Sequence, residues 1–198
     1  MKIMVVTTGG TIAKTYDEAD GALRNERPIV ESILGALRLP DLEITYRHIL
    51  SKDSLDLTDN DRELIVDTVA EAVDKHGATG SVLTVPPAFT RDAVFEAIDN
   101  GIKLLVIVTE RIPRFEVAQM AEFATMHGAR IIGPNCLGLI TPEKCKMGGI
   151  GGPAADTRKA YMPGPVGVMS RSGGMTTEIA NALTAAGLGQ STAVSIGG

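Results

Sequence analysis

Three short segments of the sequence combine glycine or hydroxyl side chains in ways that could do chemistry. The first is Thr-Gly-Gly-Thr-Ile-Ala at residues 8–13, which follows an apolar, strand-like run. Two glycines let the backbone approach a ligand closely, and the hydroxyl of Thr11 beyond them could act as a nucleophile. A Gly-Gly pair after the first strand of a sheet is just as typical of a tight turn, so both interpretations stay open.

The other two segments are candidates for ligand and anion binding. Val108, Thr109 and Glu110 end an apolar run at what should be the carboxyl edge of a sheet, where open α/β folds bind ligands. Ser-Arg-Ser-Gly at 170–173 joins a strand to a helix, and its hydroxyls and backbone N–H groups at a helix start would suit an anion. A solvent-facing strand end and a simply capped helix are the alternatives.

Alternating β-rich and amphipathic stretches must position these segments. Strands are expected at 2–6, 42–50, 81–85, 103–108 and 129–132, with helices at 28–37, 58–75, 91–100 and 113–127. Thr58 should cap the second helix, with Asp61 as the capping-box acid, and Thr90 should cap the third. This alternation predicts an α/β fold, a doubly wound, mostly parallel Rossmann-like sheet with right-handed crossovers.

The alternation of strands and helices stops between 133 and 164, where Gly, Pro and Lys are frequent. A strand, a helix and a strand are then expected at 165–169, 172–186 and 190–196. We therefore expect a Rossmann-like domain at 1–138, a linker or excursion at 139–163, and an incomplete flavodoxin-like βαβ unit at 164–198. A lone βαβ unit cannot cover both faces of its sheet, so it either joins the first sheet or belongs to something longer.

Composition narrows the functional classes. The 198 residues are 44% hydrophobic with a net charge of −5, which excludes intrinsic disorder, and the scattered Lys and Arg side chains predict no nucleic-acid partner. No apolar run approaches the roughly 18 residues of a membrane span, so we expect a cytoplasmic protein without membrane contact. Two cysteines and three histidines form no zinc spacing, and no bound metal is expected.

Residues 1 to about 75 resemble the amino-terminal part of the L-asparaginase family. The motifs are Gly-Gly-Thr-Ile-Ala at 9–13 and Ser-Lys-Asp-Ser-Leu-Asp-Leu-Thr at 51–58. The resemblance implies that Thr11 attacks a side-chain amide carbonyl, while Ser54 and Asp56 hold the α-amino and carboxylate groups of the substrate. The family's His-Gly-Thr-Asp-Thr segment, which completes the catalytic set, does not occur in this sequence.

Residues from about 77 to 198 resemble the α subunit of succinyl-CoA synthetase and related nucleotide-dependent acyl-CoA ligases. Four motifs carry this resemblance: Val-Pro-Pro-Ala-Phe at 85–89, Val-Thr-Glu-Arg-Ile-Pro at 108–113, Ile-Gly-Pro-Asn-Cys-Leu-Gly at 132–138 and Ser-Arg-Ser-Gly-Gly at 170–174. The resemblance implies that coenzyme A is contacted by Pro86, Phe89, Val108, Thr109 and Glu110. It implies that the phosphoryl group of a phosphohistidine is bound by Ser170, Ser172 and Gly173, with Asn135 and Cys136 beside it. It also implies that Thr177, where the family has Tyr, lies in the acyl-substrate site.

Other parts of the ligase pattern are missing. The family's Gly-rich phosphate loop after the first strand is replaced by residues 8–13, and none of the three histidines has the context of the phosphorylated one. We expect a catalytically incomplete, CoA- and phosphate-binding fragment whose two resemblances meet near 76–80, as in a chimera. A ligase β subunit or a second copy is the expected protein partner. The alternatives are an asparaginase-type amidohydrolase using Thr11 and a folded chimera without activity.

Overall fold

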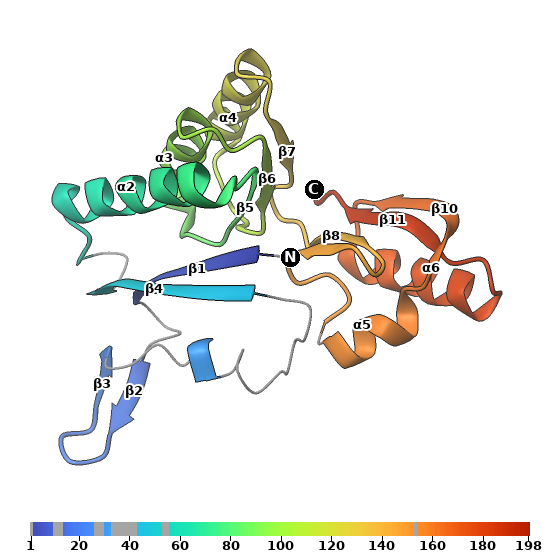
Figure 1. The fold of residues 1–198 in the computed structure, drawn as a ribbon, viewed down its shortest axis with the longest axis horizontal. Coiled ribbons are helices and arrows are strands. Elements are labelled where there is room, and N and C mark those ends of the chain that lie inside the picture. Colours follow the sequence, from blue (N-terminus) through green and yellow to red (C-terminus); the bar gives the residue numbers. More distant parts are fainter. Residues whose placement is uncertain (1, 10–13, 26–29, 33–42, 53–55, 153) are drawn as a thin grey trace. The chain divides into compact units, whose positions relative to one another are not determined.

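The computed structural model describes residues 2–9, 14–25, 30–32, 43–52, 56–152 and 154–198 (Figure 1). The chain divides into two compact units, Met1–Ala78 and Thr79–Gly198. Both units combine helices with parallel strands, and each also has antiparallel pairs, so the fold is mixed α/β with Rossmann-like sheets, as the alternating sequence pattern predicts.

The first unit is built on a parallel pair of strands. β1 (Lys2–Gly9) pairs with β4 (Glu43–Lys52) in a register that runs without interruption from Lys2↔Glu43 to Thr7↔His48 and then shifts before Gly9↔Lys52. A hairpin of β2 (Lys14–Asp17) and β3 (Ala22–Asn25) lies between them in the chain. The parallel pairing brings the carboxyl ends of β1 and β4 side by side.

Helix α2 (Asp59–His76) begins with the capping box that the sequence predicts. The Thr58 hydroxyl accepts a hydrogen bond from the Asp61 amide at 3.4 Å, and the Asp61 carboxylate accepts one from the Thr58 amide at 2.7 Å. Lys52, the last residue of β4, donates to the same carboxylate at 2.6 Å. The end of β4 is therefore tied to the start of α2 by one buried acid.

The second unit begins with three parallel strands in the order β5-β6-β7. They are β5 (Gly80–Leu83), β6 (Leu104–Ile107) and β7 (Arg130–Ile132). Each of these strands begins within two residues of the start that the sequence predicts. Leu105, Val106 and Ile107 are fully buried in the central strand. Burial on both faces explains why β6 is a continuous apolar run rather than an alternating one.

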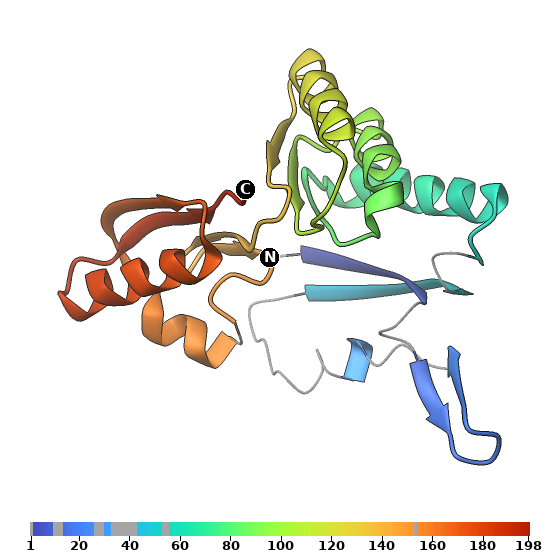
Figure 2. The same ribbon diagram turned by 180° about the vertical axis from the view of Figure 1, so that it is seen from behind.

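Two helices connect these strands, α3 (Pro87–Asp99) and α4 (Arg114–Met126). They lie side by side, as the views from both sides show (Figures 1 and 2). Their contact includes stacked rings of Phe95 and Phe123, with centroids 4.2 Å apart. The helices therefore form a continuous layer over the strands they connect.

The predicted cap of α3 is wrong. The helix begins at Pro87 after the N-cap residue Pro86, so Thr90 lies inside the helix, fully buried, and its hydroxyl donates to the Pro86 carbonyl at 3.1 Å. A proline in the first helical turn needs no N–H partner and has a backbone φ suited to a helix. The helix can therefore start earlier than its apolar periodicity alone suggests.

The remaining strands form a second sheet in the order β10-β11-β8-β9. The predicted βαβ unit is present as β10 (Pro163–Ser170), α6 (Gly173–Ala185) and β11 (Gln190–Ser195), with β10 and β11 parallel. It forms this sheet with β8 and β9 and does not extend the sheet of β5, β6 and β7.

The stretch at 139–163, expected to be a linker or excursion, has secondary structure of its own. It holds most of β8 (Gly138–Thr141), all of β9 (Cys145–Met147) and α5 (Ala154–Ala160). β8 pairs antiparallel with β11, and Ile140 joins Val168 and Ala193 in a buried core. β8 and β9 lie among Gly, Pro and Lys residues rather than in apolar, β-branched runs, which is why the sequence did not indicate them. The domain boundaries themselves stay a prediction.

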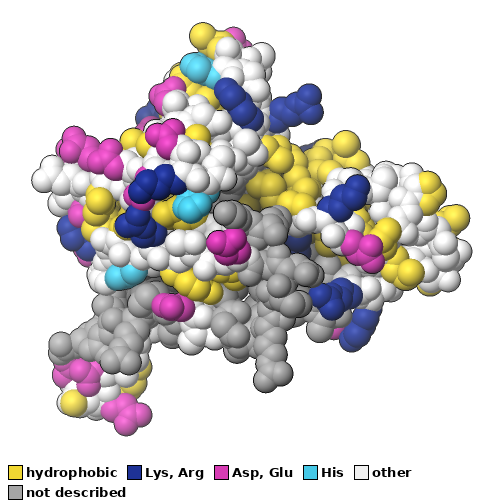
Figure 3. All heavy atoms as spheres, in the orientation of Figure 1, with side chains coloured by type: hydrophobic (Ala, Val, Ile, Leu, Met, Phe, Trp, Pro, Cys, Tyr) yellow, Lys and Arg dark blue, Asp and Glu magenta, His cyan; other side chains and the backbone are white. Residues whose placement is uncertain are grey.

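Three further expectations can be compared with the structure. Of the helix expected at 28–37, only residues 30–32 are described, and they are helical; the rest lies outside the described residues. On the face of the molecule shown in Figure 3, basic and acidic side chains are interspersed. Among the described residues, no helix is both long and apolar enough to cross a membrane.

The Asp61 contacts predict a pH-dependent contribution to the stability of the first unit. The hydrogen bond from Lys52, together with those from Thr58, lowers the pKa of Asp61 to about 2. A depressed folded-state pKa stabilises the fold above the carboxyl's ordinary pKa, and this stabilisation is lost as the pH falls from about 4 toward 2. We expect Asp61→Asn to lower the thermal midpoint at pH 7 and the difference from the parent to shrink at pH 2.

The matched control is Asp67→Asn, which changes an exposed carboxyl on the same helix. Circular dichroism melts at both pH values measure the effect. An Asp61→Asn deficit of equal size at pH 7 and pH 2 would contradict the assigned role of the charged carboxylate.

Candidate functional site

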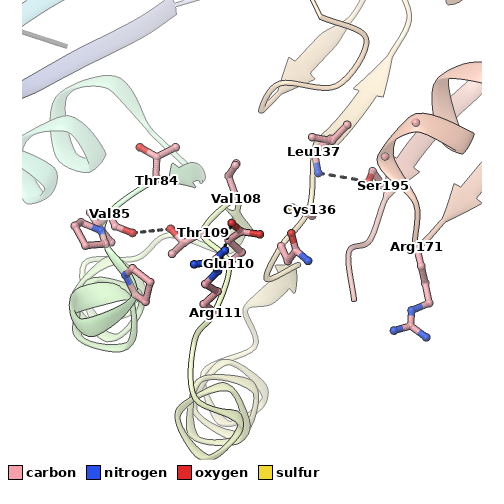
Figure 4. Close-up of a pocket in the computed structure, with 15 residues that line it drawn as sticks. Thr84, Val85, Val108, Thr109, Glu110, Arg111, Cys136, Leu137, Arg171 and Ser195 are labelled. Atoms are coloured by element: carbon pink, nitrogen blue, oxygen red, sulfur yellow. Dashed lines mark hydrogen bonds and ion pairs between the residues drawn. The ribbon is translucent and has the colours of Figure 1, made fainter. Parts of the chain in front are cut away.

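The second unit contains a cavity of about 910 Å³ at the carboxyl edge of its parallel strands. Its walls come from four places: the segments that follow β5, β6 and β7, and the start of α6, with Ser195 of β11 beside them. Figure 4 shows Val85 and Thr109 on one side, Ser195 and Arg171 on the other, and Cys136 and Leu137 between them. This is the edge at which open parallel sheets bind ligands.

The first wall is a pair of loops fastened to each other. The Val108 amide donates to the Leu83 carbonyl at 3.0 Å, which continues the pairing of β5 and β6 past the ends of the strands. The Thr109 hydroxyl then donates to the Val85 carbonyl at 2.6 Å (Figure 4). Because its hydroxyl is used in this way, Thr109 holds the two loops together and positions the exposed Glu110 that follows it.

The second wall is the loop after β7, which lies against the end of β6. The backbone amide of Asn135 donates to the Thr109 carbonyl at 2.9 Å, and the Cys136 thiol donates to the Ile107 carbonyl at 3.1 Å. A side chain at Gly133 would collide with the same Ile107 carbonyl, and its φ of 106° also favours glycine. Burial raises the pKa of the Cys136 thiol, so Cys136 is a neutral structural group.

The third wall is the start of α6. Ser172 is the N-cap residue, and its hydroxyl accepts from the Met175 amide at 3.4 Å; the Ser172 amide in turn donates to the Ser170 hydroxyl at 3.1 Å. Gly173 lines the cavity, where a Cβ would collide with Leu137. The two serines therefore shape the turn, and the helix directs its positive dipole end toward the cavity.

Several segments far apart in the sequence thus converge on one cavity. Of the residues singled out by the ligase resemblance, Pro86, Val108, Thr109, Glu110, Asn135, Cys136 and Gly173 line it. The remaining residues of that set lie outside its lining. Phe89 is in the first turn of α3, Ser170 and Ser172 form the turn behind Gly173, and the Thr177 hydroxyl bonds to the buried Tyr161 hydroxyl at 3.0 Å.

Sequence reasoning missed other lining residues. Arg171 lies inside the Ser-Arg-Ser-Gly motif and could have been included from that signal, as Arg111 could from its place next to Glu110. Thr84 and Ser195 have no local signal. Ser195 is buried, and its hydroxyl accepts from the Leu137 amide at 3.4 Å, so its place in the wall depends on how β11 packs beside the loop after β7.

The candidate residues of the asparaginase-type interpretation belong to the first unit. Thr11 and Ser54 lie outside the described residues, and Asp56 is an exposed residue just before α2. Their suggested roles stay predictions. In the parts of the chain that the structure describes, no three His, Cys, Asp or Glu side chains are grouped so that they could hold a metal ion.

Comparison with known proteins gives the class of this region. Residues 49–111, which include the ends of β5 and β6 and the first wall of the cavity, match the CoA-binding domain family. That match begins within β4, ahead of the expected change of family near 76–80. Over this segment the chain is therefore similar to CoA-binding domains.

The relatives are more specific. The chain is 46% identical over 134 residues to the α subunit 2 of ADP-forming succinate–CoA ligase from Archaeoglobus fulgidus, covering 68% of this chain and 45% of the relative. It is 43% identical over 136 residues to the corresponding α subunit from Aquifex aeolicus, covering 68% and 43%. Over two thirds of its length the chain therefore resembles these α subunits, and it spans less than half of theirs.

Solved structures agree with this fold. An ATP citrate lyase from Methanothrix soehngenii, determined with citrate and coenzyme A, matches with a TM-score of 0.60 and 27% identity, over 64% of this chain and 21% of that one. A dinucleotide-forming acetyl-coenzyme A synthetase from Candidatus Korarchaeum cryptofilum matches 99% of this chain and 38% of its own with a TM-score of 0.50. At 17% identity, the second match shows only a shared fold.

Proposed function

We propose that the cavity binds coenzyme A and that the start of α6 binds a phosphoryl group next to it. The convergence of the lining residues carries this proposal. Pro86, Val108 to Glu110, Asn135, Cys136 and Gly173 come from four separate segments, each resembling the ligase α subunits, and they meet around one space. A cavity of about 910 Å³ falls in the range of roughly 300–1,000 Å³ that is typical of small-molecule and cofactor sites.

The chemistry of the walls suits a ligand with phosphate groups. Arg111 and Arg171 both line the cavity and would attract anions, since a guanidinium donates several hydrogen bonds in a planar fork. The start of α6 adds backbone N–H groups and a positive dipole end beside Arg171. Glu110 is an acceptor at the same edge, and it would suit the hydroxyl or amide groups of the ligand.

We further propose that the chain binds CoA without turning it over by itself. Among the described residues that line the cavity there is no histidine to carry a phosphoryl group. His127, the only histidine of the second unit, caps the end of α4, where its Nδ1 lies 2.8 Å from the Phe123 carbonyl oxygen. Complete ligase chemistry would then need further protein, which we propose to be a β-subunit-type partner, since the relatives are α subunits.

The separate compactness of the two units supports a proposal about the origin of the chain. The division between Ala78 and Thr79 falls where the two resemblances meet in the sequence, and the CoA-binding match at 49–111 crosses it. We propose that the chain combines an asparaginase-like first unit with a ligase-like second unit. On this proposal the CoA and phosphate sites depend on the second unit.

The CoA proposal predicts micromolar binding by the full chain in isothermal titration calorimetry. Thr109→Val removes the hydrogen bond that fastens the loop after β6 to Val85, and we expect CoA affinity to fall by about three- to tenfold, the equivalent of one hydrogen bond. The control is Thr141→Val, which removes a hydrogen bond to Thr192 outside the cavity lining and should leave the affinity unchanged. Absence of CoA binding by the parent chain would refute the proposal.

The phosphate proposal is tested at the helix cap. Asp and Asn both serve as N-cap residues, so Ser172→Asp and Ser172→Asn should keep the start of α6 intact. Only Asp adds a negative charge there, and we expect it to weaken inorganic phosphate binding by about tenfold or more, with Asn close to the parent. Phosphate titrations followed by NMR chemical shifts measure this. Equal affinity for the Asp and Asn variants would show that phosphate binds elsewhere.

A further inference from the structure

A second group of side chains that could take part in a reaction lies in the first unit, and the proposed function does not involve it. The His48 imidazole is placed between two hydroxyl groups. Its Nε2 lies 2.8 Å from the Ser51 Oγ, and its Nδ1 lies 3.0 Å from the Thr7 Oγ1. Three side chains from two strands are thereby linked in one hydrogen-bonded row.

The fold puts this row where a ligand can reach it. Thr7 and His48 are direct partners in the parallel pairing of β1 with β4, and Ser51 follows near the end of β4. The row therefore lies toward the carboxyl ends of two neighbouring parallel strands, the edge at which α/β sheets place ligands. His48 and Ser51 are both exposed, so a small molecule can approach the Ser51 hydroxyl from solvent.

One of the two neutral tautomers of His48 would allow it to act as a base toward Ser51. For Nε2 to accept the Ser51 proton, the imidazole must be neutral and carry its own proton on Nδ1, from which it donates to the Thr7 hydroxyl. A nucleophile bonded to a base, which is in turn oriented by a third group, is the arrangement that activates serine in covalent catalysis. Thr7 is a neutral partner, so it can orient the imidazole but stabilises imidazolium less than a carboxylate would.

We propose that Ser51 is an acyl-accepting nucleophile, with His48 as its general base and Thr7 as a positioning residue, and that its substrates are small activated esters or thioesters. The Ser51 Oγ forms a bond to the acyl carbon while its proton passes to His48 Nε2. The bond from the acyl carbon to the alkoxide or thiolate leaving group breaks, and that group takes up the proton. Water then attacks the acyl-serine through the same base, releasing the carboxylic acid and restoring the Ser51 hydroxyl.

The Lys52 side chain, next to Ser51, is already bound to an acid. Lys52, the next residue after Ser51, donates to the Asp61 carboxylate at 2.6 Å and so fixes the end of β4 against the start of α2. This contact holds the backbone at Ser51 in place. The proposed site depends only on described residues of the first unit, so it stands independently of CoA binding by the second.

The test uses the full chain and 4-nitrophenyl acetate, with the acetylated residues located by peptide mass spectrometry. We expect acetyl-Ser51 in the parent chain. His48→Gln should slow its formation about 100-fold, the usual contribution of a general base. His76→Gln changes an exposed histidine at the end of α2 and should have no effect, and exposed Ser191 should remain unmodified.

Thr7 is tested by a pair of variants. Thr7→Val removes the hydroxyl but keeps the branched shape, and should slow acetylation of Ser51; Thr7→Ser restores the hydroxyl and should restore the rate. Circular dichroism checks that each variant is folded, and the site of acetylation in the parent chain needs no variant at all. Acetyl groups only on lysine or cysteine side chains, or an unchanged Ser51 rate in His48→Gln, would overturn the proposal.

Discussion

The candidate site depends on how closely the loop after β7 approaches the end of β6. Gly133 makes this approach sterically allowed, because any side chain there would collide with the Ile107 carbonyl. The Cys136 thiol and the Asn135 amide then bond to the carbonyls of Ile107 and Thr109. The Thr109 hydroxyl donates in turn to the Val85 carbonyl. Hydrogen bonds therefore link the loop after β7 to the end of β6, and the loop after β6 to the loop after β5. The cavity is the space that these loops enclose with the start of α6.

The start of α6 is joined to this assembly by packing. Gly173 lies so close to the Leu137 side chain that a Cβ there would force Leu137 to move, and the Leu137 amide donates to Ser195 of β11. The helix end and the strand ends therefore meet on the same loop, 133–138. A ligand that spans the cavity would contact the hydroxyl of Thr109 and the charged Glu110 and Arg111 at one end, and Arg171 with the start of α6 at the other.

The sequence predicted the elements whose side chains repeat with a clear period. β6 was identified from its continuous apolar run and α2 from its capping box, because burial and capping are both local properties of the sequence. Thr90 was misplaced since the proline before it can begin a helix, and β8 and β9 were missed because they lie among Gly, Pro and Lys residues. The place of Ser195 in the cavity wall and the bond between Ser51 and His48 arise from packing and local strand geometry. Neither is marked by a motif.

Hydrogen–deuterium exchange of the full chain, with and without coenzyme A, locates the CoA site. We expect CoA to slow exchange in the segments 84–87, 108–111 and 133–137, and at the start of α6, while exchange in β1 and β4 stays the same. Protection confined to the first unit, or no protection anywhere at saturating CoA, would contradict the assignment of the cavity as the CoA site.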